Sequence, residues 1–113
     1  RARYQWGNAS TSATSCTITF DAADAASAGN KLRGSMLFCF PTQNSGINNS
    51  LVQIDFVDGA IKDARCITNT ANEQVTSIGT INGLSVVINI QSNSYARPAS
   101  LSFLSVPLSW SVS

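Results

Sequence analysis

The chain contains no histidine, and this absence removes several kinds of catalytic and metal site. A Ser–His–Asp triad, a Cys–His pair and every histidine-containing metal site are excluded. The cysteines are not clustered as zinc ligands would be, and no glycine-rich phosphate loop is present. We therefore expect no catalytic residues, no cofactor and no metal, and we predict that the chain is not an enzyme.

Charge is also scarce, since only 12% of the 113 residues are charged and the net charge is +1. The basic residues are scattered, whereas a nucleic-acid-binding protein needs a basic stripe that follows the phosphates, so no nucleic-acid partner is expected. No run of about 20 apolar residues exists, which predicts no membrane span. The chain begins with Arg1 and has no signal peptide, which indicates a processed or truncated form and leaves a lost N-terminal anchor or leader as an open alternative.

The polarity of the chain comes instead from serine, threonine and asparagine. This composition is typical of secreted, cell-surface and filament proteins, so we predict an extracellular or cell-surface location. Two Asn-x-Ser sequons begin at Asn8 and Asn48. They matter only if the source secretes the chain through a glycosylating pathway.

Alternation of apolar and polar residues predicts a single β domain over residues 16–113, after an irregular N-terminal arm of residues 1–15. About seven strands with turns at near-regular spacing indicate an all-β fold, an antiparallel β-sandwich or barrel. The alanine-rich residues 21–28 are the exception. Asp21 is a good N-cap and Gly29 a good residue to end a helix, which predicts at most one short helical turn there.

The dipeptide Asp58-Gly59 predicts a two-residue type I′ hairpin between two strand-like segments. Simple pairing across this turn suits the nearest residues, but farther out it would point Asp63 toward the core and Cys66 toward water. We therefore predict a β-bulge near Lys62-Asp63, which returns Ala64 and Cys66 to the inner face.

The dipeptide Asn82-Gly83 predicts a second type I′ hairpin, in which no conflict of register arises. Ile81 and Leu84 are expected to pair beside the turn and to face the core. Further along the same face lie four more aliphatic residues: Val75, Val86, Ile88 and Ile90.

Two other segments are predicted from their apolar residues. The unbroken apolar run Met36–Phe40 is typical of a strand that is buried on both faces and therefore central in its sheet. Near the C-terminus, every second residue over 104–112 is apolar, which predicts one terminal strand with a buried face. Leu101 and Phe103 alternate in the opposite phase, so we expect a one-residue slip, most simply a β-bulge, between Phe103 and Leu104.

The cysteines are Cys16, Cys39 and Cys66, so at most one internal disulfide forms and one thiol is left over. Three pairings exist, and spacing does not choose among them. We favour Cys39 with Cys66, because both lie near strands that are expected to share a sheet.

Four side chains outside the expected core are candidates for contact with a partner or a ligand. Tyr4 and Trp6 lie in the arm, and Tyr95 and Arg97 lie in the loop before the terminal strand. Aromatic rings of this kind either anchor an arm on a partner or stack on a sugar. Trp110 is instead expected to pack in the core, because it lies in the apolar phase of the terminal strand.

A paired-carboxylate hydrolase that uses Asp55 with Asp58 or Asp63 is the least favoured function. Asp58 is a residue that a type I′ turn prefers, and Asp55 with Lys62 is expected to form a solvated cross-strand pair. Structural roles thus account for these carboxylates.

We predict a non-catalytic extracellular structural subunit, pilin-like or another surface-filament or coat protein, whose partners are copies of itself or a related subunit. The word pilin-like refers here to composition and expected architecture and rests on no motif. Assembly is expected to use the N-terminal arm and the sheet edges, especially the backbone edge of the terminal strand. The alternative is a small carbohydrate-binding or adhesin module, with a glycan as its ligand.

Overall fold

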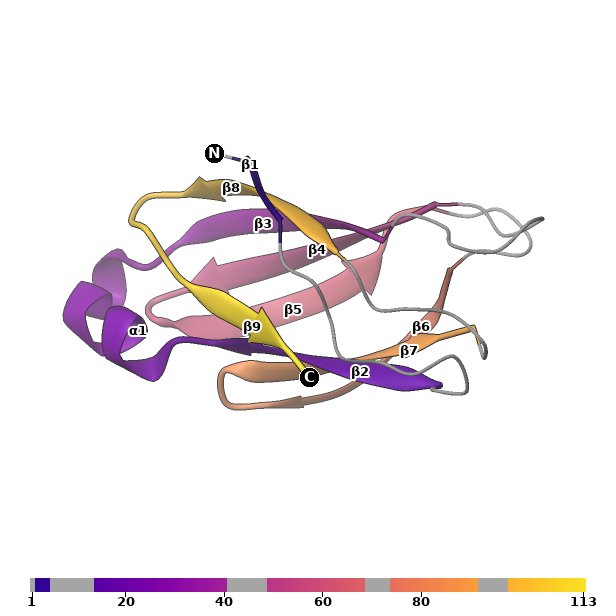
Figure 1. The fold of residues 1–113 in the computed structure, drawn as a ribbon. Coiled ribbons are helices and arrows are strands. Elements are labelled where there is room, and N and C mark those ends of the chain that lie inside the picture. The colour runs from indigo at the N-terminus through magenta and orange to yellow at the C-terminus, as the bar shows by residue number, and fades with distance from the viewer. Residues whose placement is uncertain (1, 5–13, 41–48, 69–73, 92–97) are drawn as a thin grey trace.

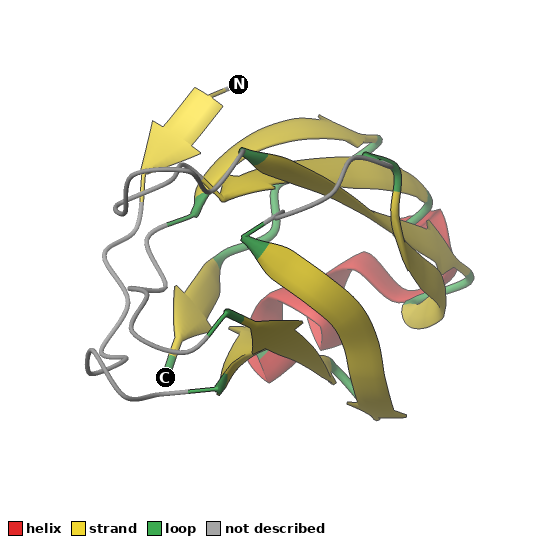
Figure 2. Cartoon of the chain, turned by 90° about the vertical axis from the view of Figure 1, so that its right-hand side faces the viewer, coloured by secondary structure: helices red, strands yellow, loops and turns green. Residues whose placement is uncertain are grey.

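The structure is a computed structural model, and it describes residues 2–4, 14–40, 49–68, 74–91 and 98–113. These residues form two antiparallel sheets that pack face to face, with one short helix at the end of the sandwich (Figures 1 and 2). The predicted all-β sandwich is therefore confirmed.

Nine strands are present in the described residues, where about seven were predicted. The elements are β1 (Ala2–Tyr4), β2 (Ser15–Phe20), α1 (Ala22–Ala28), the 3-10 helix η1 (Gly29–Lys31), β3 (Gly34–Phe40), β4 (Ser50–Val57), β5 (Ala60–Cys66), β6 (Val75–Asn82), β7 (Ser85–Ile90), β8 (Ala99–Leu104) and β9 (Trp110–Val112). Sheet A has the strand order β1-β8-β3-β4-β5, and sheet B has the order β6-β7-β2-β9. One of the two extra strands is β1, in the arm that was expected to be irregular. The other arises because the terminal segment forms two strands.

Aromatic rings from both sheets meet in the centre of the core. Phe20 of sheet B packs edge to face against Phe38 and Phe56 of sheet A, with ring centroids 6.0 and 4.9 Å apart. Trp110 of sheet B packs in the same way on Phe38, at 5.0 Å. Such pairs contribute about 0.5–1.5 kcal/mol each beyond the area that they bury, so this cluster holds the two sheets together.

Helix α1 forms where its capping residues predicted it. The Asp21 side chain accepts a hydrogen bond from the backbone N–H of Asp24 at 2.8 Å, and Gly29 ends the helix with a φ of 55°. The helix has seven residues, which is about two turns and therefore longer than the single turn expected. Ala25 faces the core and fixes the helix against it.

The Asp58-Gly59 hairpin and its bulge are both confirmed. Asp58 and Gly59 have φ values of 50° and 85°, the two positive values that a type I′ turn requires. Phe56 pairs with Ile61, but the register shifts before Asp55, which pairs with Asp63. The shift leaves Lys62 unpaired and turns Ala64 and Cys66 toward the core, as predicted.

The second hairpin turns one residue later than predicted. Asn82 pairs with Ser85, so Gly83 and Leu84 are the two turn residues. Gly83 has a φ of 60° and Leu84 has no positive φ, which fits a type II′ turn, in which only the first central residue needs φ above zero. As a result Ile81 is 39% exposed and Leu84 only half-buried, whereas Val86 and the other aliphatic residues of the hairpin's inner face are buried as expected.

The run Met36–Phe40 is central, but it is not buried on both faces. It lies in β3, which pairs with β8 on one side and β4 on the other. Every second residue from Met36 onward is buried, whereas Leu37 and Cys39 on the outer face are only half-buried. Two paired edges account for the central position, and no second layer covers the outer face in the described part of the chain.

The expected single terminal strand is two strands in different sheets. β8 ends at Leu104 in sheet A, residues 105–109 cross to the other layer, and β9 begins at Trp110 in sheet B (Figure 1). The predicted bulge after Phe103 is wrong, because the inward phase never changes. The inward residues of β8 include Ser100 and Ser102, while Leu101 and Phe103 point outward and are 41% and 60% exposed.

Candidate functional site

The four predicted contact residues are not gathered into a site by the described part of the structure. Tyr4 lies in β1, where its backbone pairs opposite Ala99 of β8. Trp6, Tyr95 and Arg97 lie outside the described residues. Contact of these four residues with a partner or a ligand therefore stays a prediction.

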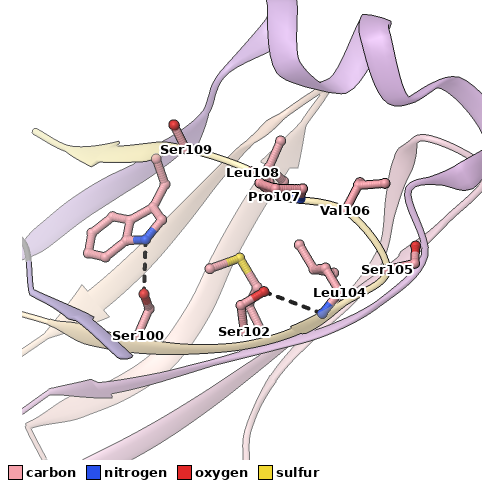
Figure 3. Close-up of a pocket in the computed structure, with 10 residues that line it drawn as sticks. Ser100, Ser102, Leu104, Ser105, Val106, Pro107, Leu108 and Ser109 are labelled. Carbon is pink, nitrogen blue, oxygen red and sulfur yellow. Dashed lines mark hydrogen bonds between the residues drawn. The ribbon is translucent and has the colours of Figure 1, made fainter. Parts of the chain in front are cut away.

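Trp110 has the core position that its place in the sequence predicted. Its side chain is buried, and its ring Nε1 donates a hydrogen bond at 3.0 Å to Oγ of Ser100 on the opposite sheet (Figure 3). The indole thereby satisfies its one polar atom inside the sandwich.

The predicted Cys39–Cys66 disulfide is not formed, and no disulfide joins any two of the three cysteines. Cys39 and Cys66 do share sheet A, as expected, but β4 lies between their strands. Cys39 pairs with Leu51 and points outward, whereas Cys66 pairs with Val52 and packs against the core. Two strand spacings amount to about 9.6 Å, which is beyond the 7 Å between Cα atoms that a disulfide spans.

The carboxylates proposed for hydrolysis are occupied in structural contacts. The Asp55 carboxylate accepts hydrogen bonds from Gln53 Nε2 at 2.8 Å, Ser35 Oγ at 2.6 Å and Arg65 at 3.0 Å. These bonds, that from Gln53 first, hold the pKa of Asp55 below its usual value. The expected Asp55–Lys62 pair is wrong, because the bulge sets Asp55 opposite Asp63, and Arg65 bridges these two carboxylates.

The remaining carboxylate, that of Asp58, lies in the hairpin turn, and its Oδ1 is 3.6 Å from Nη2 of Arg33. In the described parts of the chain no three acidic, cysteine or histidine side chains cluster in a way that could hold a metal ion. Neither described helix has the length and hydropathy that crossing a bilayer requires.

Sheet edges are the second predicted contact, and three of the four carry features that hinder pairing with another strand. The edge strand β5 carries three charged residues and a bulge: Lys62, Asp63 and Arg65. The edge strand β6 has two shifts of register, and β1 contains the charged residue Arg3. Charges and irregular register are usual means by which proteins keep edges from pairing.

The fourth edge, β9, has neither charge nor bulge. The chain from Leu108 to Ser113 contains only apolar residues and serine. Asp21 N–H bonds to Ser109 O at 2.9 Å, and Thr17 exchanges two bonds with Ser113, so the backbone of these serines points toward β2. The backbone N–H and C=O groups of successive residues in a strand point to alternate sides. Those of Trp110 and Val112 therefore point away from β2, outward from the edge of the sheet.

Sheet A extends one strand farther than sheet B at this edge. At the opposite edge β5 lies against β6, so the two sheets are level there. At the β9 edge, Trp110 contacts Phe38 of β3 and Ser100 of β8. β1 pairs on the far side of β8 and therefore overhangs β9 (Figure 2). In the described residues, sheet B has no strand beneath β1.

An open cavity of about 560 Å³ lies between the sheets at the same edge (Figure 3). One wall is the inner face of β8 together with Met36 of the neighbouring strand β3, and the other is the crossing segment 105–109 with Trp110. The lining residues are Met36, Ser100, Ser102, Leu104, Ser105, Val106, Pro107, Leu108, Ser109 and Trp110. Cavities of this size in proteins are large enough to hold several side chains or a small ligand.

Helix α1 and the loop after it fix the crossing segment in place. The Asp24 carboxylate accepts a hydrogen bond from Ser109 N–H at 3.0 Å. At the other end, Ser105 N–H bonds to Arg33 O at 3.1 Å, and Ser105 Oγ donates to Lys31 O. The cavity wall is therefore held at both ends by hydrogen bonds to the segment that joins the two sheets.

Sequence reasoning identified the terminal segment as important but missed the cavity. The missing signal was the pair Ser100 and Ser102, two small polar residues in the inward phase, where a large apolar residue is normal. Small residues at inward positions leave space between the sheets, and the cavity occupies that space.

Comparison of the chain with protein-family models, with curated proteins and with solved structures found no match in any of the three.

Proposed function

We propose that this chain is an extracellular structural subunit that assembles with copies of itself by β-strand pairing at the edge of β9. The single observation that supports this most strongly is the contrast among the four edges. β5 and β1 contain charged residues, and β6 has two shifts of register, whereas β9 has neither. β9 is only three residues long, but its backbone pairing with β2 extends from Ser109 to Ser113. An uncharged edge with outward-pointing backbone groups is a template for another strand.

The composition supports the same proposal. A surface dominated by serine, threonine and asparagine suits a protein that packs densely with copies of itself, since few lysine and glutamate side chains must be ordered or desolvated. The glycan-binding alternative has less support. Of the aromatic side chains that the structure describes, Phe103 alone is exposed, and Trp110 is buried.

The test is a charge on the β9 edge. Ser111 is exposed and lies in the middle of β9, so Ser111→Lys adds a charge at the edge without changing the core. We expect the wild-type protein to form oligomers or ordered polymers as concentration rises, and Ser111→Lys to remain monomeric in sedimentation velocity and electron micrographs. Thr76→Lys is the matched control, because it adds the same charge at an exposed site on the other edge of sheet B.

A wild-type chain that stays monomeric at high concentration would show that the proposal is wrong. Equal loss of assembly in the two lysine variants would also count against it, because net charge and not the β9 edge would then be responsible.

A further inference from the structure

The β9 edge offers backbone hydrogen bonds that only an extended chain can satisfy. Trp110 and Val112 each direct an N–H and a C=O away from β2, and these groups repeat at the two-residue period of a strand. A small molecule or a helix does not match that repeat. The ligand chemistry of this edge is therefore that of a β-strand.

Among the described residues, no strand of sheet B lies beside β9 beneath β1. A second copy could instead pair its own β9 with this β9, antiparallel about a two-fold axis perpendicular to the sheet. Sheet A of the second copy would then lie in the same layer as sheet A of the first. The β1 and β8 strands of the two copies would then occupy the same space, since each sheet A overhangs by one strand. An isolated extended segment has no second layer and meets no such obstacle.

The walls of the cavity indicate which side chains such a segment presents. The Ser100 hydroxyl accepts the bond from Trp110, Ser102 Oγ accepts from Leu104 N–H at 3.3 Å, and Ser105 Oγ donates to Lys31 O. The wall therefore combines serine hydroxyls with apolar side chains, among them Leu104, Val106 and Leu108. Small side chains, apolar or hydroxyl-bearing, suit such a space, and burial of an unpaired charge is unfavourable there.

We propose that the position beside β9 accepts one extended segment from a second copy of the chain, whose inward side chains enter the cavity between β8 and residues 105–109. The segment adds a fifth strand to sheet B beneath β1. This inference rests on the proposed function and adds to it the form of the contact, a single inserted strand in place of two joined edges. The contact is heterologous, so its repetition gives an open filament, or a ring if the rotation between copies closes.

Filling the cavity tests the inference separately from the edge. Ser102 lies on the inner face of β8, and Ser102→Leu puts an aliphatic side chain where the incoming one is expected while leaving the β9 backbone unchanged. We expect Ser102→Leu to weaken assembly by about tenfold or more in its dissociation constant, with no loss of monomer melting temperature. The exposed variant Thr76→Leu is the control and should assemble as the wild type does.

Amide hydrogen exchange on the wild-type protein gives a second measurement that needs no variant. On assembly, exchange at Trp110 and Val112 should slow strongly, because their N–H groups face the inserted strand. Exchange at Ser113 should change little, because its N–H already bonds to Thr17 at 3.0 Å in the monomer. Unchanged exchange at Trp110 and Val112 in a proven oligomer overturns the inference.

A cysteine at the edge distinguishes the inserted segment from joined edges. Two joined β9 strands would bring position 111 of each copy close together. In a Cys39→Ser, Cys66→Ser background, S111C should therefore not form a disulfide-linked dimer under mild oxidation. Rapid formation of that dimer overturns the inference and leaves the proposed function in place. If Ser102→Leu assembles normally while Ser111→Lys does not, the same conclusion follows, whereas a monomeric wild type contradicts the proposed function itself.

Discussion

The ring Nε1 of Trp110 and the hydroxyl of Ser100 form a buried hydrogen bond of 3.0 Å that joins sheet B to sheet A (Figure 3). Ser100→Ala leaves the indole N–H without this acceptor inside the core, which costs about 1–3 kcal/mol. We therefore expect the free energy of unfolding in urea to fall by that amount. Because a bond between sheets also fixes one wall of the cavity, the variant should assemble more weakly than the wild type.

Ser111→Ala is the control for that measurement. Ser111 is exposed on the same strand, so its loss should change the free energy of unfolding by no more than about 0.5 kcal/mol. A Ser100→Ala variant as stable as the control would show that the interior bond contributes little.

Gly34 lies where β3 passes very close to β8. Its φ is 115°, and a Cβ at this position would collide with the backbone oxygen of Phe103. Gly34→Ala combines a strained backbone with a steric clash against backbone, so we expect a loss of about 3 kcal/mol or more in the free energy of unfolding. Gly83→Ala separates the two effects, because Gly83 has a φ of 60° but open space around it, and its loss should be about 1–2 kcal/mol.

Thermal or urea unfolding of the two alanine variants, side by side, checks this. Equal losses would mean that the contact between Gly34 and Phe103 is relieved by a small backbone shift, and that only the positive φ matters at both positions.

The Asp55 cluster predicts a dependence of stability on pH. Gln53, Ser35 and Arg65 lower the pKa of Asp55 in the folded protein from its usual 3.8. A carboxyl whose pKa is lower in the folded state stabilises the fold above its unfolded pKa, and this contribution is lost as pH falls through the folded pKa. We expect Asp55→Asn to lower the free energy of unfolding at pH 7 by about 1 kcal/mol, and to differ progressively less from the wild type below pH of about 4.

Urea unfolding from pH 2 to pH 7 measures this difference. Gln53→Met removes the largest cause of the lowered pKa, so its pH dependence should lie between those of the wild type and Asp55→Asn. Parallel curves for the wild type and Asp55→Asn would contradict the role assigned to the cluster.

Local signals in the sequence were enough for much of this fold. The Asp58-Gly59 turn and the bulge at Lys62 followed from backbone preference and from the need to keep charged residues out of the core. Helix α1 followed from its caps. In each case the deciding interaction lies within a few residues, so the sequence contains it directly.

Features that depend on distant residues were not accessible in this way. The alternation over residues 104–112 is real, but alternation does not reveal that a chain leaves one sheet at Leu104 and enters the other at Trp110. The exposure of Leu101 and Phe103 depends on which face of sheet A is covered, and the cavity depends on how far the two sheets overlap. These are properties of packing between sheets, and no short window of sequence encodes them.

The cysteines provide a last prediction, which follows from their separation in space. Burial raises the pKa of the Cys16 thiol to about 12, and it raises the pKa of Cys39 to a lesser extent. The thiolate is the reactive form, so at pH 8 iodoacetamide should label the half-buried Cys39 and Cys66 well before Cys16. Urea should remove the difference, since unfolding exposes all three. Peptide mass spectrometry after non-reducing digestion gives the labelling order. In the same experiment, a cross-linked Cys39–Cys66 peptide from native protein would contradict the placement of these two side chains on opposite faces of sheet A.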